Sequence, residues 1–216
     1  MSLRRSFDVA VAALVLAVFA PVLLLAALAI KLSSRGPVFF VQRRVGKGGI
    51  PFPMYKFRTM AVAKKGPRLT VKHDSRVTAV GRILRRWKID EVPQFWNILR
   101  GDMTIVGPRP EIPDFVARFG EAERRLLDYV PGLAGMAVLV YPNEAELLRG
   151  HSDPERAYAE QLLPKKAAVD LVYEAERTFA SDLRLMIEIT LAIFGWNRHA
   201  DRTFRLGKIP TSAISR

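Results

Sequence analysis

Cysteine is absent from this 216-residue sequence, and histidine occurs only three times, at His73, His151 and His199. Without cysteine the chain has no disulfide framework, no thiolate nucleophile and no zinc site with cysteine ligands. The histidines lie far apart and lack the short spacing of a metal-binding motif. The composition therefore excludes cysteine-based chemistry, and it fits a reducing compartment.

Acidic residues are also in the minority, since 21 Asp and Glu stand against 34 Lys and Arg, a formal net charge of +13. Such an excess attracts phosphate groups in nucleotides, nucleic acids or anionic lipid headgroups. Charge alone does not choose among these partners. The length suits one compact domain, with or without a membrane segment.

Charged and strongly polar side chains are missing from Val9 to Ile30, a run of about 22 residues that could cross the hydrocarbon core of a bilayer. A cleaved signal peptide is the alternative. The run is longer than a typical signal core, however, and Lys31 follows it immediately, which favours a retained membrane helix.

The orientation of this helix depends on its flanks and on Pro21. Basic residues stand on both sides of the apolar run, and Lys and Arg are enriched in cytoplasmic segments, so both ends are expected in the cytoplasm. Proline removes a backbone donor and favours a bend. A helix that bends at Pro21 and returns to the same side satisfies both observations, and a single kinked span is the alternative.

The remaining pattern predicts an α+β chain that is mainly helical. A loose β-hairpin is expected over 38–60, around Gly46-Lys47-Gly48-Gly49. A basic amphipathic helix is expected from Asp74 or Ser75 to about Trp87, followed by a short helix that ends at Gly101. Further helices are expected over 114–129, 153–179 and 181–196. The last of these is predicted to pack on the core, and a place in the membrane interface is its alternative.

Groups that can handle a phosphate ester gather between Lys56 and Arg109. The basic members singled out as candidate phosphate ligands are Lys56, Arg58, Arg85 and Arg109, and the acidic members are Asp90 and Glu91. Guanidinium groups bind phosphate oxygens in a bidentate manner, and adjacent carboxylates can divide nucleophilic attack and metal binding between them. Locally, an acidic pair near a helix start is also explained by helix capping.

The order of the motifs resembles the bacterial sugar transferase family, the small monotopic phosphoglycosyl transferases that act on polyprenyl phosphate. The blocks that carry the resemblance are Gly36-Pro37-Val38-Phe39-Phe40, Gln42-Arg43-Arg44-Val45-Gly46, Tyr55-Lys56-Phe57-Arg58-Thr59-Met60, Asp90-Glu91-Val92-Pro93-Gln94, Asn97-Ile98-Leu99-Arg100-Gly101-Asp102-Met103, Val106-Gly107-Pro108-Arg109-Pro110 and Pro131-Gly132-Leu133. They run along most of the chain in one order, which makes the resemblance specific.

The resemblance implies that residues 1–35 form a re-entrant membrane helix bent near Pro21. Residues 36–216 would form a compact cytoplasmic catalytic domain with a short β-hairpin and interfacial amphipathic helices. By this analogy Asp90 attacks the β-phosphorus of a UDP-sugar and releases UMP, and the phospho-sugar then passes to polyprenyl phosphate. Glu91 would bind Mg²⁺, while Lys56, Arg85 and Arg109 would hold substrate phosphates.

The expected location is the bacterial inner membrane with the active site facing the cytoplasm, in contact with membrane lipids but not with nucleic acid, and a homodimer is left open. Departures from the family occur at Ala20, at Trp87-Lys88 and at Ala134-Gly135-Met136. The last departure leaves the sugar donor undetermined. The alternative function is a non-catalytic membrane-anchored module whose basic helix binds anionic lipid or nucleic acid.

Overall fold

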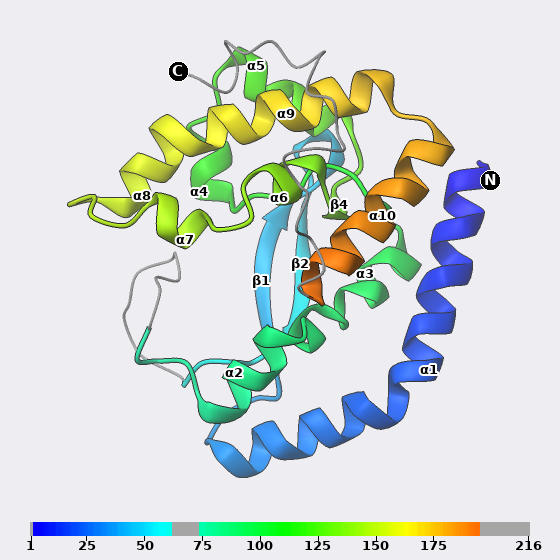
Figure 1. Ribbon diagram of the computed structural model, residues 1–216, viewed down its shortest axis with the longest axis vertical. Coiled ribbons are helices and arrows are strands. Elements are labelled where there is room, and N and C mark those ends of the chain that lie inside the picture. Colours follow the sequence, from blue (N-terminus) through cyan, green and yellow to red (C-terminus); the bar gives the residue numbers. More distant parts are fainter. Residues whose placement is uncertain (1, 62–73, 195–216) are drawn as a thin grey trace.

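A β-hairpin runs through the middle of the computed structural model, which describes residues 2–61 and 74–194 (Figure 1). Strand β1 (Phe39–Val45) pairs antiparallel with β2 (Pro51–Phe57), and the turn between them contains the 3-10 turn η1 (Lys47–Gly49). Gly48 and Gly49 have φ angles of 69° and 76°, a region that favours glycine. The predicted hairpin is confirmed, although its second strand ends at Phe57 and not at Met60.

The N-terminal apolar segment forms one long helix, α1 (Leu3–Ser33), with Pro21 inside it. Its ribbon turns a corner partway along, and its two arms follow different sides of the molecule (Figure 1). Proline lacks the amide that would bond to the carbonyl four positions earlier, and its ring crowds that carbonyl, so a bend is expected. Among the described residues, α1 is the helix long and apolar enough to cross a membrane.

Three short helical segments follow the hairpin: α2 (Ala79–Arg86), η2 (Ile89–Glu91) and α3 (Gln94–Arg100). The expectation that Asp74 or Ser75 caps α2 was wrong, because the cap is Thr78, whose hydroxyl accepts the Gly81 amide at 2.9 Å. Before Thr78, Ser75 and Arg76 form a turn and Val77 forms a β-bridge with Met60. The helix therefore starts later than the apolar spacing suggested.

A second, parallel pair joins β3 (Thr104–Val106) to β4 (Gly132–Ala134). Between them the sequence predicted one helix over 114–129, and this was wrong. The structure has three short pieces, α4 (Pro113–Val116), α5 (Glu121–Arg124) and η3 (Arg125–Asp128). Gly120 adopts an extended backbone with ψ of −178°, which interrupts the helical path.

The C-terminal part contains α6 (Met136–Val140), α7 (Glu144–Leu147), α8 (Pro154–Ala157), the π-helical turn η4 (Tyr158–Leu162), α9 (Leu163–Glu176) and α10 (Phe179–Ile193). The run from α8 through α9 confirms the helix predicted over 153–179, although it ends at Glu176, and Phe179 begins α10. The last helix is confirmed as α10, and the expected end at Trp196 lies outside the described residues. Core packing was predicted for α10 and holds for one face, where Leu185 is buried.

The core joins both arms of α1 to the rest of the chain. Ala12 of the first arm belongs to a cluster that also contains Met54, Ile98, Ile105, Val169 and Leu185. Ala26 and Ile30 of the second arm pack in another cluster with Phe57 and Leu84. The hairpin, α2 and α3 are thus held between the arms, and η2 lies among them.

Candidate active site

The acidic pair lies in a tight turn between α2 and α3. Lys88 has a φ of 55° and is the one described residue other than glycine with a positive φ. A left-handed conformation is costly for a side chain with a Cβ, and such strain is found most often at functional sites. The left-handed conformation of Lys88 reverses the chain after α2, so that η2 begins with Ile89 and presents Asp90 and Glu91 one after the other.

Glu91 is held by two cations from distant parts of the chain. Lys56 Nζ of β2 lies 3.1 Å from Glu91 Oε1, and Arg109 Nη2 lies 2.8 Å from the same oxygen. Burial by itself would raise the pKa of Glu91, but Arg109 and Lys56 hold that pKa well below its usual range. Glu91 is therefore an anion at any physiological pH.

The Lys56 ammonium responds in the opposite sense. Burial lowers the pKa of Lys56 to about 8, aided by the positive charges of Arg109 and Arg44 and opposed by Glu91. Desolvation disfavours the charged form of a lysine, and neighbouring cations add to that effect. Lys56 is thus mostly protonated at neutral pH and loses its proton as the pH rises through about 8.

Asp90 has fewer hydrogen-bond partners than Glu91. Its residue exposure is 8%, and its Oδ1 has no hydrogen-bond partner among the described residues. Burial and the negative charge of Glu91 raise the pKa of Asp90, while Lys56, Lys88 and Arg85 oppose that rise. A carboxylate that is buried, lacks bonded partners and has a shifted pKa is a candidate nucleophile.

Arg109 is fixed by more than the two prolines beside it. Its Nη1 donates to the Leu133 carbonyl of β4 at 3.0 Å, while Nη2 reaches Glu91. Two glycines let the backbones meet there, because a Cβ on Gly132 would lie 2.2 Å from the Gly107 amide nitrogen. The parallel pair β3–β4 therefore positions the guanidinium, which sequence spacing did not reveal.

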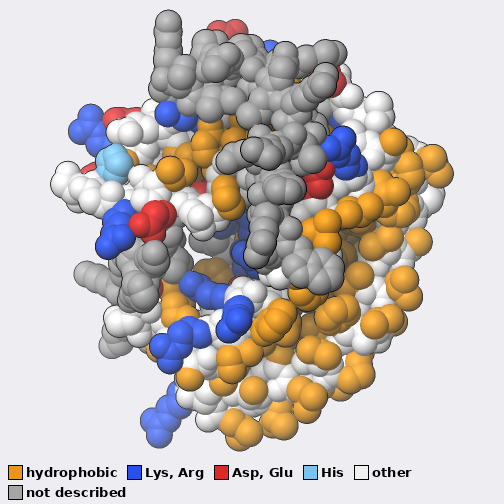
Figure 2. Space-filling model, in the orientation of Figure 1, with side chains coloured by type: hydrophobic (Ala, Val, Ile, Leu, Met, Phe, Trp, Pro, Cys, Tyr) orange, Lys and Arg blue, Asp and Glu red, His pale blue; other side chains and the backbone are white. Residues whose placement is uncertain are grey.

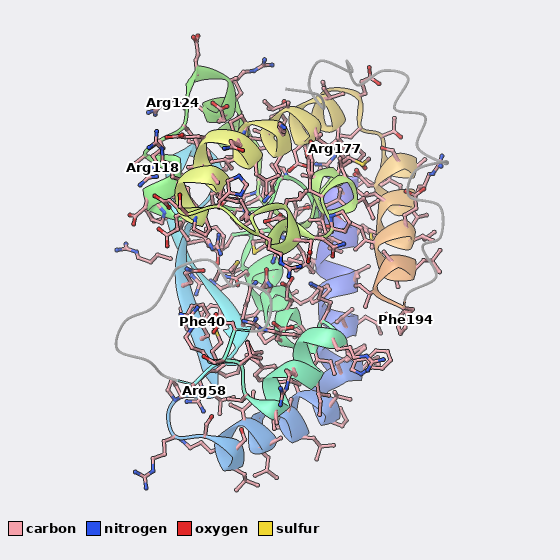
Figure 3. The ribbon with its side chains drawn as sticks, turned by 60° about the vertical axis from the view of Figure 1, so that its left-hand side comes forward. Phe40, Arg58, Arg118, Arg124, Arg177 and Phe194 are labelled. Atoms are coloured by element: carbon pink, nitrogen blue, oxygen red, sulfur yellow. The ribbon has the colours of Figure 1, made fainter. Side chains whose placement is uncertain are left out.

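The structure does not bring Arg58 into this cluster. The Arg58 side chain lies where the hairpin meets the end of α1 (Figure 3). It is 6% exposed and donates to the carbonyls of Arg35 at 2.7 Å and Ser34 at 2.8 Å, and to Ser34 Oγ at 3.0 Å. These are the contacts of a group that caps a helix C-terminus.

Arg85 takes an intermediate position. Its Nε donates to Thr59 Oγ1 at 2.8 Å, and its charge lowers the pKa of Asp90 without an ion pair between the two side chains among the described contacts. Figure 2 shows Lys and Arg side chains gathered over α2 and beside a hollow in front of the hairpin. The basic side of α2 therefore borders the acidic pair.

A second buried charge cluster behind Arg109 was missed. Arg44 lies 3.6 Å from Glu111, Tyr158 donates to Glu111, and Lys166 Nζ donates to Tyr158 at 2.9 Å. Burial and the negative charge of Glu111 raise the pKa of Tyr158, which keeps the phenol neutral. Arg44 stood in one of the recognised blocks, but nothing in the local sequence pointed to Tyr158 or Lys166.

The family is decided by a comparison that covers most of the chain. The model of the family described as bacterial sugar transferase matches residues 1–195. The chain belongs to the bacterial sugar transferase family. The match includes every site residue discussed above, and the expectation of an enzyme of this family is confirmed.

Relatives in this family carry related names. The UDP-glucose:undecaprenyl-phosphate glucose-1-phosphate transferase of Caulobacter vibrioides is 41% identical over 197 residues, which cover 85% of this chain and 67% of the relative. The UDP-N-acetylgalactosamine-undecaprenyl-phosphate N-acetylgalactosaminephosphotransferase of Aeromonas hydrophila is 41% identical over 152 residues, 67% of this chain and 35% of the relative. The exopolysaccharide production protein PSS of Rhizobium leguminosarum bv. phaseoli is 38% identical over 194 residues, 85% of this chain and 91% of the relative.

These relatives differ in length. This bacterial sugar transferase spans about a third of the Aeromonas protein and most of the Rhizobium protein. The family match, residues 1–195, contains the bent helix, the hairpin and the acidic pair.

Proposed function

We propose that this chain transfers a sugar 1-phosphate from a UDP-sugar to undecaprenyl phosphate through a covalent intermediate on Asp90. An oxygen of the Asp90 carboxylate attacks the β-phosphorus, the bond from that phosphorus to the bridging oxygen breaks, and UMP leaves. A phosphate oxygen of the lipid then attacks the same phosphorus, the bond to Asp90 breaks, and a polyprenyl diphosphate sugar forms. The names of the Caulobacter and Aeromonas relatives support this donor and acceptor class.

The unpartnered Oδ1 of Asp90 is the observation that carries the proposal. A nucleophile needs an oxygen whose lone pairs are not already engaged, and Asp90 has one. Glu91 Oε1, in contrast, accepts from both Lys56 and Arg109. This difference supports Asp90 as the attacking group and Glu91 as the fixed anion that holds the two cations in place.

Those cations have a role in substrate binding under this proposal. An ionised Asp90 repels an anionic diphosphate, and positive groups around it offset the repulsion. Lys56 and Arg109 already lie within 3.1 Å of Glu91, so they are preorganised before substrate arrives. Arg85 adds a third positive group near Asp90, whereas the contacts of Arg58 support a structural role.

Magnesium is the proposed cofactor, and the oxygen donors fit it. The described residues contain no group of three or more His, Cys, Asp or Glu side chains that could enclose a metal. Mg²⁺ at phosphoryl-transfer sites, however, needs only one or two carboxylates together with substrate phosphates and water. Glu91 would provide this carboxylate, and the open oxygen of Asp90 stays free to attack. Bound there, the ion would neutralise charge on the leaving phosphate.

A re-entrant path for α1 is proposed from the bonds at its two ends. Near its start, Arg5 donates to the Leu99 carbonyl at 2.9 Å, and Asp8 accepts from Thr104 Oγ1 at 2.6 Å. At its end, the carbonyl of Ser34 accepts from Arg58. A straight helix of this length would be roughly 45 Å long and would carry one end away from the domain. Both ends on one domain favour the same side of the membrane.

The outer surface of the bent helix supports contact with lipid. Figure 2 shows hydrophobic side chains along the bent helix on one side and at the bottom of the molecule. The exposed apolar residues include Leu14, Val18, Leu24, Leu25 and Leu28 of α1 and Leu183, Ile187, Leu191 and Phe194 at α10. We place this surface in the inner leaflet of the bacterial inner membrane, with the active site facing the cytoplasm because the chain is strongly basic.

UMP release tests the proposal directly. The purified protein in lipid nanodiscs is incubated with Mg²⁺, undecaprenyl phosphate and a panel of UDP-sugars, and UMP is measured. Wild type is expected to release UMP with at least one donor, and Asp90→Asn is expected to release none. Asp128→Asn, which makes the same change on η3 outside the site, is the matched control and should retain activity.

The outcome also separates the alternative function. A non-catalytic module that binds anionic lipid predicts that Asp90→Asn behaves as wild type in liposome binding and that no UMP appears with any donor. That pair of results would contradict the enzymatic proposal.

A further inference from the structure

Thr59 lies just beyond the end of β2, and helix α2 is fixed to it through both its backbone and its side chain. Thr59 is 6% exposed, and its carbonyl accepts from the Thr78 amide at 3.0 Å, at the start of α2. A Cβ on Gly81 would lie 2.0 Å from the same carbonyl oxygen, so α2 packs directly on the backbone there. Farther along α2, Arg85 Nε donates to the Thr59 hydroxyl at 2.8 Å.

Arg85 differs in this respect from the other arginines of α2. Arg82 and Arg86 are exposed, and the Arg86 guanidinium lies 5.7 Å from the centre of the Trp87 ring. Arg85 is half-buried, and its charge acts on Asp90. Among the described residues, Arg85 is the arginine of α2 whose guanidinium is held by a side-chain hydrogen bond.

The bond to Thr59 decides which edge of the guanidinium is available. A guanidinium carries five N–H donors in one plane, so it can offer a pair of donors from its side, Nε with one Nη, or from its end, both Nη atoms. In Arg85 the Nε donor is engaged by Thr59, and Nη1 and Nη2 have no hydrogen-bond partner in the described ranges. The end pair is therefore the edge left for a phosphate group, which accepts two parallel bonds from such a pair.

We infer that Thr59 is a positioning residue whose hydroxyl fixes the Arg85 guanidinium so that its two Nη atoms receive phosphate oxygens of the substrate. This rests on the proposed function, which supplies the diphosphate. Without the hydroxyl, the long arginine side chain samples several rotamers, and the cost of ordering it falls on the binding step.

The same device serves the other cations of the site. Lys56 and Arg109 are held by Glu91 before substrate arrives. Arg85 has no ion pair with either acidic residue among the described contacts, so a neutral acceptor from another part of the chain takes that role. A neutral acceptor leaves the charge of Arg85 unpaired and available to an anion.

Thr59→Val tests the inference because valine keeps the branched shape and the backbone carbonyl, so the contacts of that carbonyl with Thr78 and Gly81 stay. KM for the UDP-sugar is expected to rise about three- to tenfold, with kcat for UMP release within about twofold of wild type. Thr59→Ser keeps the hydroxyl and should restore KM to within about twofold. Wild-type KM in Thr59→Val would overturn the inference, as would failure of Thr59→Ser to restore it.

Thr78→Val is the matched control, since it removes another threonine hydroxyl that bonds to α2. This hydroxyl caps the helix by accepting from the Gly81 amide at 2.9 Å and does not touch Arg85. Loss of a cap lowers stability, so the melting temperature should fall while KM stays within about twofold. An equal rise of KM in Thr78→Val would show that any disturbance of α2 weakens binding, and it would overturn the specific role of Thr59.

Binding of inorganic pyrophosphate tests the inference without turnover. Calorimetry in nanodiscs compares wild type, Thr59→Val, Arg85→Met and the double variant. Each single change should weaken binding, and the double variant should bind no more weakly than Arg85→Met, because Thr59 acts through Arg85. Additive losses, an unaffected Thr59→Val or no binding by wild type would overturn the inference.

The two proposals fail in different ways. Pyrophosphate binding that depends on Thr59 through Arg85, together with no UMP release from any donor, would support the inference and refute the proposed function. UMP release by wild type together with pyrophosphate binding that ignores Thr59 would do the reverse.

Discussion

Arg58→Met is the sharpest test of how the bent helix is held. The change removes four hydrogen bonds from a guanidinium to the end of α1. Three of 2.7 to 3.0 Å go to the Arg35 carbonyl, the Ser34 carbonyl and Ser34 Oγ, and one of 3.4 Å goes to the Ile30 carbonyl. A net bond to a charged group contributes roughly 1.5–3 kcal/mol, but the freed carbonyls stand at a helix end where water can reach them. We therefore expect a loss of about 2–4 kcal/mol, less than four independent bonds would give.

Thermal unfolding in nanodiscs measures this loss. For a chain of this size, 1 kcal/mol corresponds to roughly 2–4 °C, so the melting temperature should fall by about 4–16 °C. KM for the UDP-sugar should be unchanged, because Arg58 lies outside the Glu91 cluster. Arg43→Met on β1 removes the same charge from an exposed residue and should melt as wild type.

The opposite pattern would refute the structural role. If Arg58→Met melts as wild type while KM for the UDP-sugar rises tenfold or more, Arg58 binds substrate phosphate, as the sequence motif first suggested. The two roles therefore differ in both measurements.

Two further predictions concern residues around the site. In Gly132→Ala the new Cβ would lie 2.2 Å from the Gly107 nitrogen and 2.4 Å from its oxygen, so β3 and β4 must separate. For Gly132→Ala we expect a loss on the order of 3 kcal/mol or more in unfolding free energy and at least tenfold lower UMP release. The control Gly49→Asn, in open space at the hairpin tip, should have little effect on either measurement. Wild-type activity in Gly132→Ala would disprove the role of this contact. Burial raises the pKa of Asp170 to about 7, so the native state binds a proton that the unfolded chain has already lost, and this contribution to stability disappears as pH rises from about 4 through 7. Asp170→Asn keeps an oxygen that can accept from the Ala137 amide. It should be more stable than wild type at pH 8 by up to roughly 4 kcal/mol and similar to wild type near pH 4. Urea unfolding at both pH values measures this, and an equal difference at the two pH values would contradict the assignment.

Local patterns in the sequence determined several elements of the fold. The apolar run of α1, the hairpin around the glycine-rich tip, and the helices α8 to α10 followed from hydrophobic spacing and turn residues, which act over a few positions. The prediction of one helix over 114–129 was wrong because it also rested on local spacing alone. That spacing was compatible with a helix, but Gly120 takes an extended conformation in the folded chain. Propensity is a weak preference that tertiary contacts override.

Only the tertiary structure decided how the site residues divide their roles. Lys56, Arg58 and Arg109 are all cationic candidates in the sequence, yet two of them reach Glu91 and the third binds the end of α1. Thr59 stood in a recognised motif without a role, and its bond to Arg85 became visible only in the folded chain. Hydrogen bonds between positions tens of residues apart depend on where the backbone brings them, so composition and motif order could place these groups in one region but could not say which of them meet.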